Sequence, residues 1–473
     1  MVRFFFEQAE RNPQTMAIQH GSRSVTYAEL KDLVTGFQIK FQMKGFVNSK
    51  KVLVLHPLSI EMYAALLALL ANACTLVFVE EWTSLADVKM AQQKIKCDGL
   101  LCTPKVRMIS WLQAPFRKLK WLNTRLTQSG TSNLLVADVQ ANQAAIISFT
   151  SGTGSASKAV IRTHAIVNAQ FLALQSHIVT SEAALMCTNF PVVILLNLGL
   201  GISTFISSNL KLSALPESNF YQLAREIESN HITHLSFSPF VLYQLCQRLE
   251  KTISLKQIIC GGAALFPSRI KEIQQKISAE NFTVLYGSSE AEPIAHCNAM
   301  DVIMKENEPG LYAGSVDDFT ELKVVKTENN QVELCKNGEA GEVMVTGLHV
   351  VKNYMDSEQA YHQNKILFEG EIWHRTGDYA YFNSEQHLFL TGPLNQQFNG
   401  QYLMEIEKKL ANIKGLVFGT VINNKAYIQM EKDATEDLKE RIKEQLPTLK
   451  DIVFMNLPMD KRHHGKIKYR LLS

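Results

Sequence analysis

Several features that would point to particular classes of protein are missing from this sequence of 473 residues. Its eight cysteines include no Cys-x-x-Cys pair, so we expect reduced, mostly buried thiols and no zinc site. The net charge of +3 is too small to indicate nucleic-acid binding by itself. We expect no signal peptide, because Glu7 interrupts a short apolar stretch, and we expect a cytoplasmic protein.

Uninterrupted apolar runs are also scarce. The two longest, Met62 to Val79 and Phe190 to Ile206, approach the roughly 18 residues of a membrane-spanning helix. Asn72 and Thr75 interrupt the first run, and Asn197 with several glycines interrupts the second. A helix that leads into a buried strand explains both runs better than a transmembrane span.

Segments of helix length and strand length alternate through most of the chain. Lys51 to Leu55 is typical of a strand, Ile60 to Leu70 of a helix, and Thr75 to Val79 of another strand. This alternation predicts an α/β fold with parallel sheets covered by helices. The length of the chain predicts at least two domains.

From about residue 312 the pattern changes to shorter, alternating strands, which predicts a β subdomain over about 312–391. The turn-rich stretch Thr391-Gly392-Pro393-Leu394-Asn395 is the best domain boundary. We therefore predict a domain over 1–392 and a small α/β domain over 393–473. The elements expected in the small domain are a helix at 405–410, a strand at 427–430 and a helix at 434–445.

The most informative segment runs from Phe149 to Val160 and contains hydroxyls, glycines and small residues before Lys158. It follows an apolar run, Ala144 to Phe149, that predicts a buried strand. Small residues allow backbone N–H groups to approach and cradle an anion such as a triphosphate. It is not a Walker A loop, which would end in Gly-Lys-Ser/Thr. A flexible Gly/Ser loop is the alternative.

This segment resembles, position for position, the Thr-Ser-Gly-Thr-Thr-Gly-x-Pro-Lys-Gly signature of acyl-adenylate-forming enzymes, the AMP-forming acyl-CoA synthetases and their relatives. It departs from that signature only by small residues, at Gly154, Ser155, Ser157 and Ala159. Thr26-Tyr27-Ala28-Glu29-Leu30 resembles the family's early Thr-Tyr-x-Glu-Leu. The resemblance implies a large N-terminal domain with two parallel-rich sheets and a β subdomain, followed by a small mobile C-terminal domain.

The resemblance also implies ATP and Mg²⁺ as cofactors, with CoA or a phosphopantetheine as acceptor. Glu290, in Tyr286-Gly287-Ser288-Ser289-Glu290, would hold Mg²⁺, a hard cation that prefers oxygen ligands. Taken alone, this carboxylate would more commonly be a solvated loop residue. The family pattern places the following residues around the nucleotide: Thr150, Ser151, Gly152, Thr153, Lys158, Gly262, Ala263, Tyr286, Gly287, Ser289 and Asp378.

Two further positions carry specific roles by the same resemblance. Asp378, in Thr376-Gly377-Asp378, would accept hydrogen bonds from both ribose hydroxyls, although an Asp after Gly is otherwise an ordinary turn residue. Lys466 would bridge the acid's carboxylate and the α-phosphate and stabilise the transition state, with Thr150 and Glu290 as the other catalytic groups. The alternative for Lys466 is a basic tail that touches solvent or nucleic acid.

The acyl pocket is expected to be apolar. The resemblance places Phe190, Pro191, Val192 and Gly261 at this pocket. Amino-acid-activating relatives have an Asp after the Phe, and here Pro191 occupies that position. Because a buried amine would lack a partner, we predict an apolar, fatty-acyl-like acid or a hydroxylated relative. His296 is placed at the pocket as a hypothesis, and His164 is assigned no role.

The hinge departs from the family pattern. In place of Gly-Arg-x-Asp/Lys the chain has Gly392-Pro393-Leu394-Asn395, which brings the domain rotation of the second half-reaction into question. Three alternatives to acid–thiol ligation therefore stay open. The first is a β-lactone synthetase acting on a 3-hydroxy fatty acid, because segments near Glu290 and Lys466 resemble those enzymes. The second is a non-catalytic nucleotide- or acyl-binding homologue, which would fit the changes in the hinge. The third, ranked last, is a basic nucleic-acid-binding module. An acyl carrier protein is a possible partner.

Overall fold

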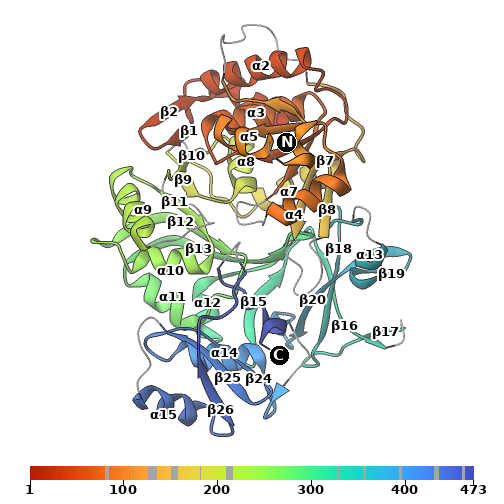
Figure 1. Ribbon diagram of the computed structural model, residues 1–473. Helices are drawn as coiled ribbons and strands as arrows, with labels where there is room; N and C mark the ends of the chain where they lie inside the picture. Colours follow the sequence, from red (N-terminus) through yellow and green to blue (C-terminus); the bar gives the residue numbers. More distant parts are fainter. Residues whose placement is uncertain are drawn as a thin grey trace.

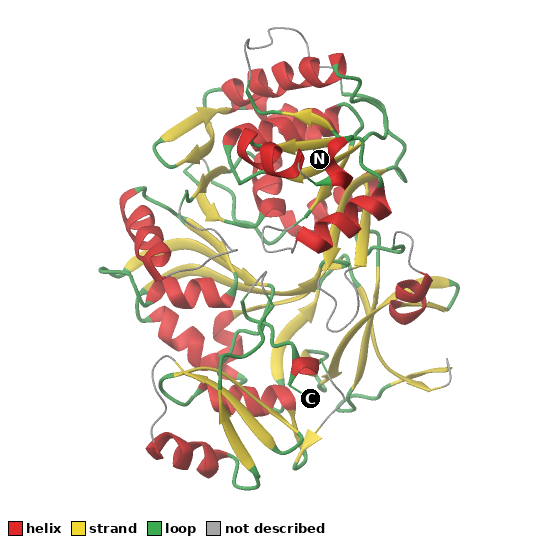
Figure 2. Ribbon diagram, viewed as in Figure 1, coloured by secondary structure: helices red, strands yellow, loops and turns green. Residues whose placement is uncertain are grey.

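The computed structural model is a mixed α/β molecule built from stacked sheets and helices (Figure 1, Figure 2). In Figure 1 the N-terminal third forms the upper part, and the residues after 397 form the lower part. The structure describes residues 1–79, 85–111, 113–125, 136–150, 158–181, 183–208, 217–328, 331–354, 358–393, 397–430, 436–460 and 464–472.

The first sheet has the order β6-β5-β3-β4-β7-β8, and its neighbours are parallel except for the antiparallel pair β7/β8. Helices α2 to α6 accompany it, as the alternating sequence pattern predicts. Its strands are β3 (Lys51–Leu55), β4 (Thr75–Phe78), β5 (Gly99–Cys102), β6 (Lys120–Leu122), β7 (Ala144–Thr150) and β8 (Lys158–Thr163). Its helices are α2 (Tyr27–Met43), α3 (Ile60–Ala71), α4 (Leu85–Ile95), α5 (Pro104–Trp111) and α6 (Ala114–Arg117).

The Thr26–Leu30 segment marks the start of α2. The Thr26 hydroxyl accepts a hydrogen bond from the backbone N–H of Glu29 at 3.2 Å, and the Glu29 carboxylate accepts one from the N–H of Thr26 at 2.8 Å. This reciprocal pair satisfies two N–H groups that a helix start leaves without intrahelical partners. Tyr27 is fully buried beneath it. The segment therefore has a structural role here.

Both long apolar runs form a helix followed by a strand, as predicted. In the first, every residue of α3 except Glu61 is buried, because α3 contributes to a core that contains Ile18 of the second sheet and Leu76 of the first. In the second, helix α8 (Pro191–Leu200) ends at Gly201, whose φ of 82° stops the helix before β10 (Ser203–Ile206). Within the described residues, no helix is long and apolar enough to cross a membrane.

The second sheet runs in the order β2-β1-β10-β9-β11-β12-β13-β14 and is parallel from β1 to β13. Its strands are β1 (Met16–His20), β2 (Arg23–Thr26), β9 (Leu185–Thr188), β10, β11 (His234–Phe237), β12 (Ile253–Gly261), β13 (Ile277–Ser288) and β14 (Ala291–Asn298). Its helices are α1 (Val2–Arg11), α7 (His164–Gln175), α8, α9 (Glu217–Ser229), α10 (Pro239–Cys246), α11 (Pro267–Gln274) and α12 (Ala299–Met304).

The hydrogen-bonded ladder continues through β14 and β15 into an antiparallel region in the order β15-β21-β20-β18-β16-β17, with β19 on β20. The antiparallel pairing begins at β13/β14, about twenty residues before position 312, where the sequence analysis expected the change of pattern. The elements are β15 (Leu311–Val316), β16 (Glu321–Glu328), β17 (Gln331–Leu334), β18 (Gly341–Thr346), α13 (Glu358–Asn364), β19 (Lys365–Phe368), β20 (Glu371–Phe382) and β21 (Leu388–Gly392).

The last part of the chain has its own sheet, β24-β25-β26, and its own apolar cluster, which includes Ile406 and Ile442. It packs on the second sheet's helices and the β-rich region: Lys408 donates hydrogen bonds to the carbonyls of Glu308 and Gly310, both at 2.7 Å. Its elements are β22 (Gln397–Phe398), β23 (Gln401–Tyr402), α14 (Leu403–Ala411), β24 (Leu416–Ile422), β25 (Lys425–Met430), α15 (Glu436–Gln445), β26 (Asp451–Phe454) and the short η1 (Tyr469–Leu471).

Candidate active site

A cavity of about 850 Å³ lies where the first sheet, the second sheet and the C-terminal segment meet. Its walls come from chain segments that are far apart in the sequence. The expected site residues among its described lining are Lys158, Phe190, Pro191, Val192, Gly261, Gly262, Gly287, Ser289, Glu290 and Lys466. The fold therefore brings together residues that the sequence separates by up to about three hundred positions, from Lys158 to Lys466.

Other expected residues are placed differently. Ala263, Tyr286 and Asp378 are not among the described lining residues. Ser151, Gly152 and Thr153, and the side chain of Thr150, lie outside the described part of the chain, as do Leu394 to Gln396 of the hinge. The backbone of Thr150 ends β7 opposite Lys158 of β8, so the two flanks of the signature loop are paired strands.

Glu290 lies at the turn between β13 and β14. Its Oε1 accepts a hydrogen bond from the Tyr354 hydroxyl at 3.3 Å, and its backbone carbonyl accepts one from the N–H of Val351 at 2.7 Å. Among the described residues no hydrogen bond reaches Oε2. A carboxylate held at one oxygen and open at the other, on the wall of the cavity, has the donor chemistry that Mg²⁺ requires.

Positive side chains keep Glu290 ionised. Burial alone would raise the pKa of this carboxyl, but nearby His374, Lys365, Arg162 and Lys158 lower it. Burial lowers the pKa of His374 to about 4 and that of Lys365 to about 7, so neither carries a full charge at neutral pH. The charge that faces Glu290 therefore rests on Arg162, which cannot lose its proton in proteins, together with Lys158.

Arg162 on β8 is a functional residue that the sequence reasoning missed. Its guanidinium donates hydrogen bonds to the Ser289 carbonyl at 2.7 Å and to the Ser148 hydroxyl at 2.8 Å. It thereby fixes the Glu290 turn against the strands that carry the signature loop. The sequence feature that could have identified Arg162 is its place within the apolar strand 158–163, because a buried charge requires partners.

Lys158, Lys365 and Tyr354 complete this corner. Lys158 donates a hydrogen bond to the Asn364 side chain at 3.0 Å, at the end of α13. The Lys365 ammonium donates to the Val351 carbonyl and lies over the Tyr354 ring. Tyr354 precedes α13 and Lys365 follows it in the sequence. The residues next to them form no motif that would mark them as site residues, because their role depends on contacts with distant strands.

Tyr286 and Asp378 form a second polar group behind the lining. The Tyr286 hydroxyl donates to Asp378 Oδ2 at 2.9 Å, and the Asp378 N–H donates to the Thr376 hydroxyl at 3.1 Å. Burial raises the pKa of Asp378, and Lys466 and the Tyr286 hydrogen bond act in the opposite direction. Gly377, with a φ of 76°, bends the long strand β20 at this point. Asp378 is thus within electrostatic reach of Lys466.

Lys466 is exposed and is carried by a loop that Asp460 holds. The Asp460 carboxylate accepts hydrogen bonds from the N–H groups of Lys466 at 2.8 Å and Gly465 at 3.2 Å. The Asp460 N–H in turn donates to the Lys466 carbonyl at 2.8 Å. Farther along, the Tyr469 hydroxyl donates to the buried Glu407 on α14 at 2.9 Å. The ammonium position thus depends on a short, internally bonded loop.

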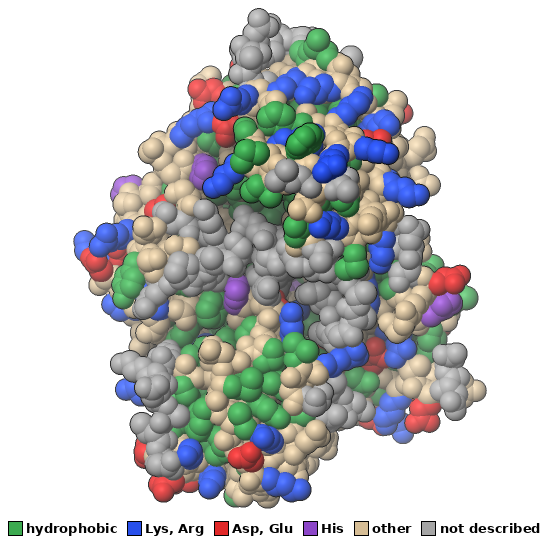
Figure 3. Space-filling model, in the orientation of Figure 1, with side chains coloured by type: hydrophobic (Ala, Val, Ile, Leu, Met, Phe, Trp, Pro, Cys, Tyr) green, Lys and Arg blue, Asp and Glu red, His purple; other side chains and the backbone are tan. Residues whose placement is uncertain are grey.

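Three basic residues near the C-terminus face the cavity. Lys466, Lys468 and Arg470 all contribute to its lining. On the face shown in Figure 3, lysines and arginines are spread over the upper and lower parts and interspersed with acidic residues. This arrangement favours a site for a small anionic ligand over a nucleic-acid surface.

The apolar side of the cavity is formed by α7, α8 and the ends of β12 and β13. Pro191 occupies the first turn of α8, where the missing N–H costs nothing, and Phe190 precedes it. Leu174, Ile178, Leu195, Leu196, Ile259 and Leu285 line the same wall. The acidic residues of the described lining, Glu290, Glu292 and Asp460, belong to the β13–β14 turn and the C-terminal loop.

One sequence hypothesis is corrected. His296 is not among the described residues that line the cavity; its ring is directed at Asp317 instead. The reason is that His296 lies on β14 six residues after Glu290, where the strand has turned away from the cavity. His164 is the first residue of α7, and its backbone N–H donates to the Gln143 carbonyl at 3.0 Å.

Comparison with known sequences gives one family match. The model of a family described as AMP-binding enzyme matches residues 5–355. The 2-succinylbenzoate–CoA ligase of Enterococcus faecalis is 20% identical over 430 residues, which is 88% of this chain and 84% of that protein. The olefin β-lactone synthetase of Stenotrophomonas maltophilia is 24% identical over 301 residues, which is 59% of this chain and 54% of that protein. The chain spans about half the length of several curated relatives it matches.

Comparison with solved structures supports the fold. The O-succinylbenzoate coenzyme A synthetase of Bacillus subtilis, solved with ATP and a magnesium ion, has a TM-score of 0.81 at 17% identity and covers 99% of this chain and 98% of that chain. A double mutant of the same enzyme with a product analogue has a TM-score of 0.70 at 18% identity, with the same coverage. The α/β architecture expected from the sequence is confirmed.

Proposed function

We infer the function of this chain from one premise: it belongs to the AMP-binding enzyme family. We propose that it is an AMP-forming ligase that activates a carboxylic acid with Mg·ATP and transfers the acyl group to a thiol. The observation that carries the proposal is the convergence of Glu290, Lys158 and Lys466 on a single cavity with an apolar wall. A carboxylate for the metal, lysines for the phosphates and a wall for the acid are the parts that this reaction requires.

In the proposed first step, a carboxylate oxygen of the acid attacks the α-phosphorus, and pyrophosphate leaves to give an acyl-adenylate. Lys466 stabilises the negative charge that develops on the α-phosphate oxygens as the new bond forms. Glu290 is the residue that would hold Mg²⁺, which supplies charge neutralisation to the departing pyrophosphate when bound. Asp378 and Tyr286 would position the ribose and the adenine.

In the proposed second step, a thiolate attacks the acyl carbonyl and AMP leaves. The acceptor is CoA or the phosphopantetheine of a carrier protein. We propose that residues 393–473 act as a mobile domain in this step, with 1–392 as the main domain. The separate sheet and the separate apolar cluster of residues 397–472 support this division.

The present arrangement suits the first step. Lys466 lies on the cavity wall, and the TM-score is higher against the ATP-bound neighbour than against the neighbour with the product analogue. We therefore infer that the adenylation arrangement is the one described here. Pro393 stands where the family carries a hinge arginine, so the rotation is the step most altered in this chain.

We propose that the acid is apolar. The wall between α7 and α8 is formed mainly by leucine, isoleucine, valine, phenylalanine and proline side chains, with the uncharged polar Gln170 and Asn189 and with His177 beside them. Burial of an alkyl chain against the apolar part contributes about 25 cal/mol per Å². An acid with a cationic amine would have no carboxylate partner on this wall among the described residues. A fatty-acyl-like acid therefore fits better than an amino acid.

Acid-dependent exchange of labelled pyrophosphate into ATP tests the proposal. A panel of fatty, 3-hydroxy fatty, aryl and amino acids should give exchange with an apolar class and none with amino acids. Absence of exchange with every acid, in a sample with a cooperative thermal transition and measurable ATP binding, would instead support a non-catalytic nucleotide-binding protein.

The match to an olefin β-lactone synthetase supports a second candidate. In that case the 3-hydroxyl of the substrate attacks its own acyl-adenylate carbonyl, loses its proton, and displaces AMP to close a β-lactone. AMP release from a 3-hydroxy fatty acid without any thiol would support this candidate. A strict requirement for CoA or a carrier thiol would exclude it.

A further inference from the structure

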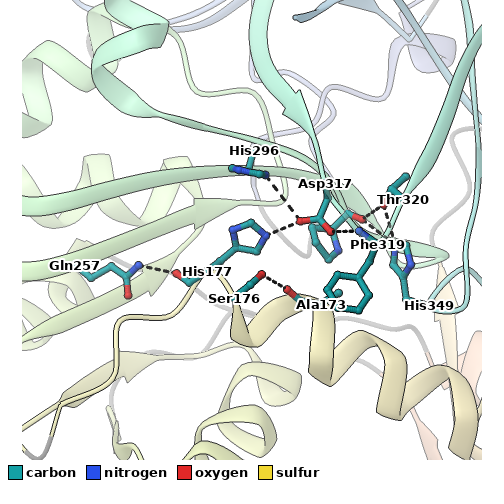
Figure 4. A network of polar contacts seen from close by, with 10 residues as sticks. Ala173, Ser176, His177, Gln257, His296, Asp317, Phe319, Thr320 and His349 are labelled. Carbon is teal, nitrogen blue, oxygen red and sulfur yellow. Dashed lines mark hydrogen bonds and ion pairs between the residues drawn. The ribbon is translucent and has the colours of Figure 1, made fainter. Parts of the chain in front are cut away.

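Three side chains of types that bind metals in proteins converge on one point, and none of them has a role in the proposed ligase reaction. His177 follows the end of α7, His296 lies on β14, and Asp317 follows β15. Figure 4 shows the two imidazole rings and the carboxylate directed at one another from these different elements. One ligand atom from each residue lies within 4.8 Å of the other two.

The distances are close to those of a metal centre. His177 Nε2 lies 2.6 Å from Asp317 Oδ2, and His296 Nδ1 lies 3.8 Å from the same oxygen. Metal–ligand bonds of about 2.0–2.2 Å in a tetrahedral Zn²⁺ site place ligand atoms about 3.3 Å apart. Both distances differ from that value by less than 1 Å, so small side-chain rotations would suffice.

The surroundings favour an ion. The side chains of His177 and Asp317 are 8% and 2% exposed, so water does not saturate their polar atoms. His296 is half-buried, yet its Nδ1 atom is inaccessible to solvent and has no hydrogen-bond partner in the described structure. A hydrogen-bonded His–Asp pair accounts for His177 but leaves this nitrogen unsatisfied, which is costly. A cation between the three groups would satisfy all of them.

Supporting contacts hold the ligands in place (Figure 4). The second Asp317 oxygen, Oδ1, accepts a hydrogen bond from the Phe319 N–H at 3.0 Å. The His177 carbonyl accepts one from the Gln257 side chain at 2.7 Å. A hydrogen bond to a ligating carboxylate, such as that to Asp317, orients metal ligands in proteins, whereas the Gln257 contact fixes the backbone that carries the His177 ring.

The ligand types indicate which metal. Two imidazoles and one carboxylate suit Zn²⁺ and similar divalent transition metals, whereas Mg²⁺ prefers oxygen ligands alone. Three protein ligands leave at least one position for water or another ligand. His177 also belongs to the cavity lining, so that open position could be reached from the cavity.

We propose that His177, His296 and Asp317 form a site for a divalent transition metal of the Zn²⁺ class. The site ties the end of α7 to strands β14 and β15. It is separate from the Mg²⁺ position at Glu290 and independent of the proposed ligase reaction. The sequence expectation of no zinc site rested on the cysteines, and this site uses none of them.

Metal binding to the full-length protein tests the proposal. Protein stripped with a chelator is titrated calorimetrically with Zn²⁺ in excess Mg²⁺ and without ATP, and Co²⁺ absorption in the visible range reports the ligand geometry. We expect one tight ion per chain. Because loss of even an outer partner costs about 10- to 100-fold in affinity, His296→Gln should weaken binding by at least about 100-fold.

The variants separate a lost ligand from a lost fold. His296→Gln removes a half-buried ring that makes no hydrogen bond, and thermal unfolding checks that the protein stays folded. His177→Gln provides a second ligand deletion, and His362→Gln, on exposed α13 surface, is the matched control and should bind normally. Absence of tight binding by the unmodified protein would overturn the proposal, and so would His177→Gln and His296→Gln variants that bind Zn²⁺ as tightly as the unmodified protein.

Discussion

Glu290 and Lys466 face the same cavity but are held in different ways. Glu290 lies between two long strands, and its charge is fixed by Arg162 and Lys158, which belong to another sheet. Lys466 is exposed and depends on a few backbone hydrogen bonds to Asp460. Glu290, the proposed metal ligand, is therefore fixed within the body of the molecule, whereas the position of Lys466 depends on the placement of the C-terminal segment.

This contrast predicts that the lysine can be removed without harm to the fold but with the largest loss of activity. Lys466→Met should lower acid-dependent ATP–pyrophosphate exchange by about 100- to 1,000-fold, because a charge-stabilising donor is lost in the transition state. The thermal midpoint should stay unchanged. Lys443→Met, at an exposed position of α15, is the matched control and should keep full exchange. Unchanged exchange in Lys466→Met would remove the residue from the mechanism.

Glu290→Gln should have the next largest effect on exchange, about 100-fold, and should raise the Mg²⁺ concentration needed for half-maximal rate. Unlike Lys466→Met, it should also lower the thermal midpoint, since Arg162 and Lys158 lose the charge that they face. The first effect is measured by exchange rates over a range of Mg²⁺ concentrations, and the second by thermal unfolding. A variant that lost exchange at every Mg²⁺ concentration with no change in metal dependence would contradict the metal role.

Asp460 is expected to be a positioning residue. Asp460→Ala should lower the exchange rate constant about tenfold with little change in KM for ATP, less than the roughly 100-fold that a 1 Å misplacement can cost. Asp460→Asn keeps an oxygen that can accept both N–H groups and should restore most of the rate. If Asn and Ala variants were equally impaired, the loop hydrogen bonds would not explain the effect.

The smallest expected effect concerns the anchor of the C-terminal segment. Burial raises the pKa of Glu407 from 4.5 to about 7, so its folded form holds a proton more tightly than the unfolded form. Its stabilising contribution is full below about pH 4.5 and is lost as the pH rises through about 7. Glu407→Gln should flatten this part of the pH profile of the thermal midpoint. If the thermal midpoint of Glu407→Gln changed with pH as steeply as that of the unmodified protein, Glu407 would not be the group responsible.

The sequence predicted the features that depend on local pattern. The run from Met62 to Val79 was interpreted as a helix and a strand because polar residues interrupt it, and α3 and β4 have those positions. The strand before the signature loop, β7, likewise forms where the apolar run Ala144 to Phe149 predicts it. These elements form where short-range periodicity and burial agree.

The sequence could not predict contacts between distant segments. Arg162 reaches a carbonyl 127 positions away, and Lys365 faces Glu290 from a different strand, so neither has a local pattern. His296 was expected at the cavity because it follows Glu290 closely, but strand geometry directs it to Asp317. Family resemblance predicted a role for Glu290, whereas the charged side chains around it could be identified only from the folded structure.

The most direct test of this account is a single-turnover reaction of the unmodified protein with Mg·ATP and an apolar acid, quenched and analysed by mass spectrometry. The account predicts an acyl-adenylate that appears only when the acid is present and disappears when a thiol acceptor is added. If no apolar acid gave an acyl-adenylate or pyrophosphate, so that only intact ATP and acid were recovered, the account would be contradicted.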